Sequence, residues 1–246
     1  MELHVEIARK VYPAVAKAKQ HVAIENLNFS LASGEFVCMV GPSGCGKTTL
    51  LNILAGLDRD FAGEIRVIHG EKRNPAVGYV FQEPRLLPWR TVRENIDLVL
   101  QPQQDPAPAE HLLKVMGLEH VQHVYPPRLS LGMSRRVALV RAFAIEPDLL
   151  LMDEPFVSLD APTARRIRKL LIAVWRERPH TVLFVTHDLR EAIALADRVL
   201  FLSTHPARLL NDIRVGILRD ERDDERKCEN FRRSLLADYA ELRHLL

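Results

Sequence analysis

The chain has 246 residues, of which 47% are hydrophobic, and a formal net charge of +2 at pH 7. This length suits one large domain, or one core with a smaller lobe, and the hydrophobic content is sufficient for a buried core. The small charge gives no bias toward nucleic acid or acidic ligands, and no apolar run approaches the roughly 20 residues of a membrane span.

The N-terminal sequence and the cysteines favour a cytosolic protein. The first residues lack the basic and apolar regions of a secretory signal peptide. Cys38, Cys45 and Cys228 lack the spacing of a metal site or a disulfide framework. His120 and His123 are three residues apart, but no further ligands lie nearby in the sequence, so we expect both on the solvated surface.

The most informative segment is a glycine-rich loop between an apolar run at residues 36–40 and another at residues 50–54. Read as strand, loop and helix, it predicts a phosphate site, because successive backbone N–H groups and the helix N-terminus converge on one anion. Lys47 is placed to reach the β- and γ-phosphates, and the Thr48 hydroxyl to take one position on Mg²⁺. The alternative is an ordinary glycine-rich turn, which the flanking strand and helix disfavour. The predicted phosphate-binding residues are Gly41, Pro42, Ser43, Gly44, Cys45, Gly46, Lys47, Thr48 and Thr49.

Short apolar runs separated by helical patterns predict an α/β fold with a mainly parallel sheet. The expected strands are residues 36–40, 77–81, 149–152, 182–186 and 199–203. The proline-rich segment Gln101–Pro108 predicts a loop that leads into a helical lobe beginning near Ala109. Composition alone makes residues 129–136 a loop before a helix, with Ser130 as a plausible N-cap.

Two carboxylates follow the expected strand at residues 149–152. At the carboxyl edge of a parallel sheet they would lie beside Mg²⁺ and the γ-phosphate. Asp153 suits Mg²⁺ coordination, largely through water, and Glu154 suits the polarisation of an attacking water. A strand end followed by a turn also favours Asp and Pro, and is the alternative at these positions.

The last third of the chain predicts two more helices. A helix opens at residues 161–163 and has a basic side that we interpret as solvated rather than bound to nucleic acid. Its apolar residues recur at helical spacing: Ile167, Leu170, Leu171 and Val174. His205 and Pro206 mark the end of the last core strand, and the mixed charges of residues 219–227 predict a solvated linker. A final helix at residues 231–242 is expected to pack on the core, with a partner surface as the alternative.

The order of these elements resembles the ATPase subunit of an ABC transporter over nearly the whole chain. The glycine-rich loop resembles that family's Walker A motif, and Asp153 and Glu154 match its Walker B motif and catalytic glutamate. Gln82 matches the Q-loop, and His187 matches the switch histidine.

Three further positions extend the resemblance. Ser158-Leu159-Asp160 matches the D-loop, and Ser130 and Gly132 fall on the signature loop. Tyr12 is the candidate for the aromatic residue that stacks on adenine, although the segment from Tyr12 to Ala23 is longer than usual.

The resemblance implies a P-loop NTPase (RecA-like) fold with an N-terminal antiparallel β lobe and an inserted α-helical lobe near residues 84–145. It implies an ATPase domain over residues 1–205 and a C-terminal charged linker and helix over residues 206–246. It also implies ATP and Mg²⁺ as cofactors. The implied catalytic residues are Glu154, His187, Lys47 and Gln82; the implied metal ligands are Thr48, Gln82 and Asp153; and Tyr12, Ser130, Gly132 and Asp160 are implied to contact nucleotide.

The signature loop departs from the family's usual L-S-G-G-Q at Leu131 and Met133. Leu131 restricts the backbone if that position needs a positive φ, which suggests weakened or altered ATPase activity. Met133 followed by a basic helix start is similar to the branch that imports nitrate, sulfonates, taurine and related small molecules.

The family's assembly implies a homodimer of ATPase subunits held by two permease subunits on the cytoplasmic face of the membrane, an external solute-binding protein, and no nucleic acid. Residues 84–92 match the region that receives a short permease helix, and Trp89 is either an anchor of that groove or a core residue. The alternative function is a soluble, non-transport relative acting on nucleic-acid or ribosomal complexes. This chain lacks the long coiled coil or second cassette typical of such relatives.

Overall fold

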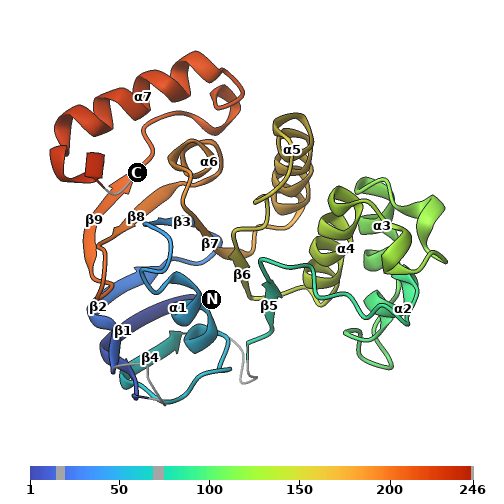
Figure 1. Cartoon of the computed structure of the whole chain (residues 1–246). Coiled ribbons are helices and arrows are strands. Elements are labelled where there is room, and N and C mark those ends of the chain that lie inside the picture. The colour runs from blue at the N-terminus through green and yellow to red at the C-terminus, as the bar shows by residue number, and fades with distance from the viewer. Residues whose placement is uncertain (15–19, 69–74, 245–246) are drawn as a thin grey trace. The chain divides into compact units, whose positions relative to one another are not determined.

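The computed structural model describes residues 1–14, 20–68 and 75–244. The chain divides into two compact units, which we describe separately. The first comprises Met1–Lys72 and Thr181–Leu246, and the second comprises Arg73–His180 (Figure 1).

The first unit contains the predicted antiparallel lobe. Three strands pair in the order β2-β1-β4: β1 (Glu2–Tyr12), β2 (His21–Leu31) and β4 (Ala62–Ile68). Leu3, Val5 and Ile7 alternate along β1 and are buried, as expected for a strand with one face on the core. The lobe is thus confirmed.

A second group of strands in this unit is mainly parallel. Strand β3 (Phe36–Val40) pairs in parallel with β7 (Thr181–Thr186) and with β8 (Arg198–Leu202). Every residue of β3 and β7 is buried, which is why these strands read as continuous apolar runs. Strand β9 (Leu209–Arg214) pairs antiparallel with β8. The expectation that the sheet ends at residues 199–203 was therefore wrong, because β9 is half exposed and carries no apolar run.

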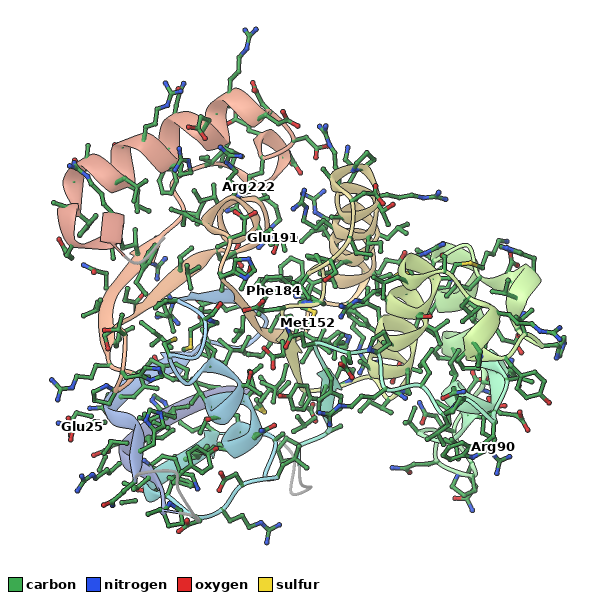
Figure 2. All side chains as sticks on the ribbon, viewed as in Figure 1. Glu25, Arg90, Met152, Phe184, Glu191 and Arg222 are labelled. Carbon is green, nitrogen blue, oxygen red and sulfur yellow. The ribbon has the colours of Figure 1, made fainter. Side chains whose placement is uncertain are left out.

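The helices of the first unit are α1 (Lys47–Leu54), α6 (Leu189–Leu195) and α7 (Glu225–Asp238). The expected C-terminal helix is α7, which packs against α6 (Figure 1). Arg222 lies in the segment expected as a solvated linker, yet it is buried and donates to the carbonyls of Ala196 (2.5 Å) and Ile217 (3.0 Å). Figure 2 shows it beside these helices. A buried arginine thus holds the C-terminal helix to the unit.

The second unit contains the parallel pair β5 (Val77–Val80) and β6 (Leu149–Asp153) and the helical lobe. Its helices are α2 (Val92–Asp97), α3 (Ala107–Val115), α4 (Leu131–Ala144) and α5 (Ala161–Glu177). Short 3-10 turns occupy Glu119–Val121 and Pro126–Arg128 here, and Arg219–Glu221 and Ala240–His244 in the first unit. The predicted helix after residue 160 is confirmed, with Ile167, Leu171 and Val174 buried. In the described parts of both units, no helix combines the length and apolar character needed to cross a bilayer.

Candidate functional site

The glycine-rich loop between β3 and α1 has a backbone that only glycine adopts easily. Gly44 and Gly46 have φ values of 76° and 113°, in the left-handed region. A Cβ atom on Gly46 would lie 2.9 Å from the carbonyl oxygen of Ala23. Helix α1 begins directly after this turn, and Leu50 N–H donates to the Gly46 carbonyl at 2.9 Å. The loop therefore places a helix N-terminus where a phosphate group binds favourably.

Lys47 sits at the start of α1 and folds back over the loop. Its Nζ donates to the carbonyls of Gly41 at 2.7 Å and Pro42 at 2.9 Å, and the side chain is only 5% exposed. Burial of an ammonium group is favourable only with such partners. The loop thus holds a fixed positive charge, which suits the γ-phosphate of a nucleotide.

Tyr12 lies at the end of β1 and reaches the same loop. Its hydroxyl is 3.1 Å from the Thr49 hydroxyl oxygen, and Lys10 Nζ is 4.9 Å from the centre of its ring. The ring is 39% exposed, which leaves apolar surface available for stacking. Part of the long segment that follows Tyr12, residues 15–19, is outside the described residues.

The register of the sheet brings His187 to the phosphate loop. Val40 of β3 is the direct partner of Thr186 of β7, so Gly41 and His187 leave their strands at the same edge. The exposed His187 is carried on a tight turn, in which Asp188 N–H donates to Thr186 Oγ1 at 3.0 Å and Thr186 Oγ1 donates to Glu191 at 2.9 Å (Figure 2 labels Glu191). The first unit thus assembles loop, lysine, tyrosine and histidine.

The second unit assembles the carboxylates with Gln82. Val80 of β5 is paired with Met152 of β6, labelled in Figure 2. Gln82, just after β5, and Asp153, the last residue of β6, therefore lie at one edge. Asp153 is buried and Glu154 is half-buried. This placement confirms that the apolar run of β6 delivers both carboxylates to a strand end.

The segment after Glu154 turns sharply before α5. Glu154 and Ser158 have positive φ values of 42° and 63°, which are strained for residues other than glycine. Asp160 caps α5 by accepting from Thr163 N–H at 2.9 Å. This backbone hydrogen bond lowers the pKa of Asp160, so the carboxylate stays ionised at the helix N-terminus.

The signature loop forms the start of α4. Ser130 is the N-cap, accepting from Met133 N–H at 3.2 Å, which confirms the cap. A Cβ atom on Gly132 would lie 2.9 Å from Thr163 Cγ2, so glycine permits the close approach of α4 to α5. Leu131 begins the helix and is not among the described residues with positive φ. The condition for a backbone restriction at Leu131, a positive φ, is therefore not met, and its side chain is 43% exposed on an ordinary helical turn.

Trp89 lies in a loop of the helical lobe and is 69% exposed, so the interpretation as a core residue was wrong. The loop is held by a residue that the sequence did not reveal. The fully buried Asn95 accepts from Leu87 N–H at 2.7 Å and donates to the carbonyls of Leu87 at 3.1 Å and Arg90 at 3.0 Å. Arg93, Glu94 and Asp97 of the same helix are charged, so the sequence gives no signal that Asn95 is buried.

The oxygen donors of the second unit fit Mg²⁺. Gln82 and Asp153 supply an amide and a carboxylate at one strand edge. Mg²⁺ keeps several waters and takes few protein ligands besides nucleotide phosphates. A full cage of protein ligands is not required, and the described residues contain no cluster of three or more His, Cys, Asp or Glu residues suited to a metal. His120 and His123 are exposed, as predicted.

Comparison with known proteins defines the class. The family described as ABC transporter matches residues 24–157. The aliphatic sulfonates import ATP-binding protein of a Bacillus cereus strain is 40% identical, with 88% of each chain covered. A protein of the same name from Burkholderia cenocepacia is 42% identical, covering 94% of this chain and 85% of its own.

The fold is similar to that of a solved ATP-binding cassette, a dimer in a post-hydrolysis state bound to ADP and Pi. The TM-score is 0.73 at 29% identity, covering 88% of this chain and 100% of that one. The fold and site are those of a P-loop ATPase. The chain belongs to the ABC transporter family, and it is an ATP-binding, ATP-hydrolysing cassette.

Proposed function

We propose that this protein is the ATPase subunit of an importer for small organic sulfonates or similar oxyanions. The observation that carries the ATPase part of the proposal is the first unit's phosphate loop, with Lys47 held over its own carbonyls and His187 at the same strand edge. The relatives named as sulfonate importers span most of the chain and support the transport role. The departure at Met133 agrees with the same branch.

We assign the first unit to nucleotide binding. The loop residues 41–49 contact the phosphates, Lys47 neutralises the γ-phosphate, and the exposed ring of Tyr12 stacks on adenine. His187 contacts the γ-phosphate from the adjoining strand. The positive helix end and Lys47 balance charge that develops during phosphoryl transfer, where positioning and electrostatics dominate.

We assign the second unit to metal and water. Asp153 and Gln82 would supply oxygen ligands to Mg²⁺, which when bound would neutralise charge on the phosphates. In the glycine-rich loop, Thr48 is the metal ligand that the family resemblance implies. Glu154 accepts a hydrogen bond from the attacking water and orients it. Ser130, Gly132 and Asp160 serve a nucleotide held by a second cassette, so ATP joins two copies and hydrolysis releases them.

We infer the assembly from the family. Two cassettes act on the cytoplasmic face of the membrane, bound to two permease subunits, and an external solute-binding protein delivers the solute. The exposed Trp89 supplies an aromatic anchor for the permease. No observation favours the alternative of a non-transport ATPase acting on nucleic-acid or ribosomal complexes.

The test is to tag the protein in its own cell, solubilise the membranes gently, and identify what co-purifies. We expect a multi-span permease in stoichiometric amount, and its gene neighbourhood then gives solutes to test for uptake. Recovery from the soluble fraction alone, with ribosomal or nucleic-acid partners, would overturn the importer role while leaving the ATPase assignment intact.

A further inference from the structure

One buried arginine of α4 bridges two segments of the second unit that are distant in sequence. Arg135 is 4% exposed. One terminal nitrogen of its guanidinium donates to the Gln82 carbonyl, and the other donates to the Val157 carbonyl at 3.2 Å. The first carbonyl follows β5 and the second lies three residues after Glu154, so a single planar group holds both.

This placement is costly, which argues that it has a use. Burial of the guanidinium lowers the pKa of Arg135, opposed in part by the charge of Glu83. Among the residues that the structure describes, Arg135 Nε is a buried donor with no partner. A buried charge whose partners are mostly neutral carbonyls recovers less than a charge paired with a carboxylate. What Arg135 offers instead is a rigid fork of donors with fixed spacing.

The segments that it holds are strained. Val157 N–H donates to the Glu154 carbonyl at 3.2 Å and closes a turn. The first residue of this turn, Glu154, and the residue that follows it, Ser158, both have positive φ. Such backbone persists only where its surroundings determine it. Val157 thus makes two hydrogen bonds: its N–H closes the turn, and its carbonyl accepts from the Arg135 guanidinium. Through the second bond, Arg135 restrains the turn.

A second arginine of the same helix repeats the arrangement further along. Arg141 donates to the carbonyls of Pro84 and Arg85, each at 2.9 Å, and Arg85 also has a positive φ, of 46°. Three of the five described non-glycine residues with positive φ thus lie in segments whose carbonyls these two arginines hold: Arg85, Glu154 and Ser158.

We propose that Arg135 is a positioning residue for ATP hydrolysis. By holding the Gln82 and Val157 carbonyls together, it sets the orientation of the Glu154 turn relative to Gln82, and thereby the alignment of water and metal. The inference rests on the roles proposed above for Gln82 and Glu154. Arg135 contacts neither nucleotide nor water in this account and acts only through these two backbone segments.

The test compares Arg135→Met, which keeps the stem and removes the donors, with Arg135→Lys, which keeps the charge and loses the two-pronged geometry. For full-length protein with MgATP, we expect kcat to fall about 10- to 100-fold in the Met variant, the scale of a misplaced catalytic group. We expect the Lys variant to lie between it and the wild type. KM and the Kd for ATP stay within about twofold, because binding rests on the first unit.

A matched control separates positioning from a general loss of stability. Val140 is fully buried on the same helix and contacts neither carbonyl through a hydrogen bond, so Val140→Ala destabilises α4 without touching the fork. We expect it to keep wild-type kcat. By hydrogen exchange with mass spectrometry, peptides covering residues 82–86 and 154–159 exchange faster in Arg135→Met and not in Val140→Ala.

The outcomes are distinguishable. The positioning role is overturned if Arg135→Met keeps kcat within twofold of the wild type. It is also overturned if Val140→Ala loses as much kcat and as much protection from hydrogen exchange as Arg135→Met. Glu154→Gln tests the underlying assignment separately, because wild-type hydrolysis in that variant removes the proposed role of Glu154 whatever Arg135 does. Loss of hydrolysis in Glu154→Gln with retention in Arg135→Met sinks this inference alone.

Discussion

The two units hold their functional residues at strand ends by different means. In the first, the shape comes from the backbone itself, since Gly44 and Gly46 adopt left-handed φ values and Lys47 is bound by carbonyls of its own loop. In the second, side chains outside the segments hold them: Asn95 of the following helix holds the Trp89 loop, and Arg135, 22 residues from Val157, holds the Glu154 turn. One site is local in sequence and the other is not.

The difference has a chemical reason. A phosphate needs a ring of N–H donors, which a short run of glycines can supply alone. A water-orienting carboxylate needs one oxygen placed to a fraction of an ångström, and a segment with strained φ at Glu154 and Ser158 keeps its shape only under restraint from its neighbours. We therefore expect variants of the first unit to affect binding, and variants of the second to affect turnover or assembly.

The largest expected effects come from one charged residue in each unit. Lys47→Ala removes the buried ammonium from the loop and should weaken ATP binding about 100-fold or more, and hydrolysis with it. Glu154→Gln keeps an oxygen that can accept a hydrogen bond but removes the negative charge and basicity of the carboxylate, so hydrolysis should fall at least about 100-fold while ATP binding remains near wild type. Equilibrium binding of a fluorescent ATP analogue and phosphate release measure the two. If both variants lose ATP binding equally, the assignment of binding to the first unit and turnover to the second is wrong.

A glycine pair tests whether the first unit depends on its backbone. Gly46→Ala places a Cβ atom 2.9 Å from the Ala23 carbonyl oxygen at a φ of 113°. Gly56 also has a positive φ, of 70°, but an added Cβ would meet nothing within 4 Å. Both alanines carry a left-handed penalty of roughly 1–2 kcal/mol, so Gly56→Ala is a matched control for strain.

We expect Gly46→Ala to weaken ATP binding at least about tenfold and Gly56→Ala to leave it unchanged, with a larger loss in Tm in Gly46→Ala because its Cβ also meets the Ala23 carbonyl oxygen. Isothermal titration calorimetry and thermal unfolding measure these quantities. Normal ATP affinity in Gly46→Ala would show that the loop tolerates displacement and that its shape is not fixed by this glycine.

The sequence was most informative where function is local. The run from Gly41 to Thr49 and the two carboxylates at the end of β6 each lie on a few consecutive residues. Their chemistry can therefore be predicted from the sequence without a structure. Prediction failed where the answer depends on distant partners. Strand β9 is half polar and is defined by pairing with β8. Arg222 lies in a charged run, yet its side chain is buried and donates hydrogen bonds to two backbone carbonyls.

The same limit applies to the second unit. The basic start of α4 reads as an ordinary helix surface, and the two acceptors of Arg135 are 53 and 22 residues away. Leu131 shows the opposite error, because a departure from the family's glycine suggested strain where the structure has a regular helical turn. Side-chain hydrogen bonds to remote carbonyls leave no periodic trace in a sequence.

Trp89 tests whether the second unit also carries the contact to the permease. Trp89→Ala should weaken permease binding about 10- to 30-fold, the scale of an aromatic hot spot, with ATP affinity and Tm unchanged because the side chain is exposed. Leu218→Ala, an exposed residue of the first unit, is the control and should have no effect. Co-purification and titration with permease in detergent give the affinities. Loss of ATP binding together with docking would mean a folding defect instead.

The smallest effect is a pH dependence of stability in the second unit. Burial, with a smaller contribution from the charge of Arg178, lowers the pKa of His180 from its usual 6.5, and its ring lies 5.8 Å from that of Phe143. The unfolded chain therefore binds the proton more readily. The contribution of neutral His180 is complete above pH 6.5 and is lost as the pH falls below that value toward the lowered native pKa.

We expect the free energy of unfolding to decline as the pH falls below about 6.5 because of this residue. His180→Asn should flatten that decline, whatever its effect on stability at neutral pH, while the exposed control His120→Asn should leave the slope unchanged. Urea unfolding at a series of pH values measures the slope directly. If the slope in His180→Asn equals that of the wild type, the His180 imidazole is protonated in the folded protein without loss of stability. Burial in the second unit would then cost a charged side chain less than we infer.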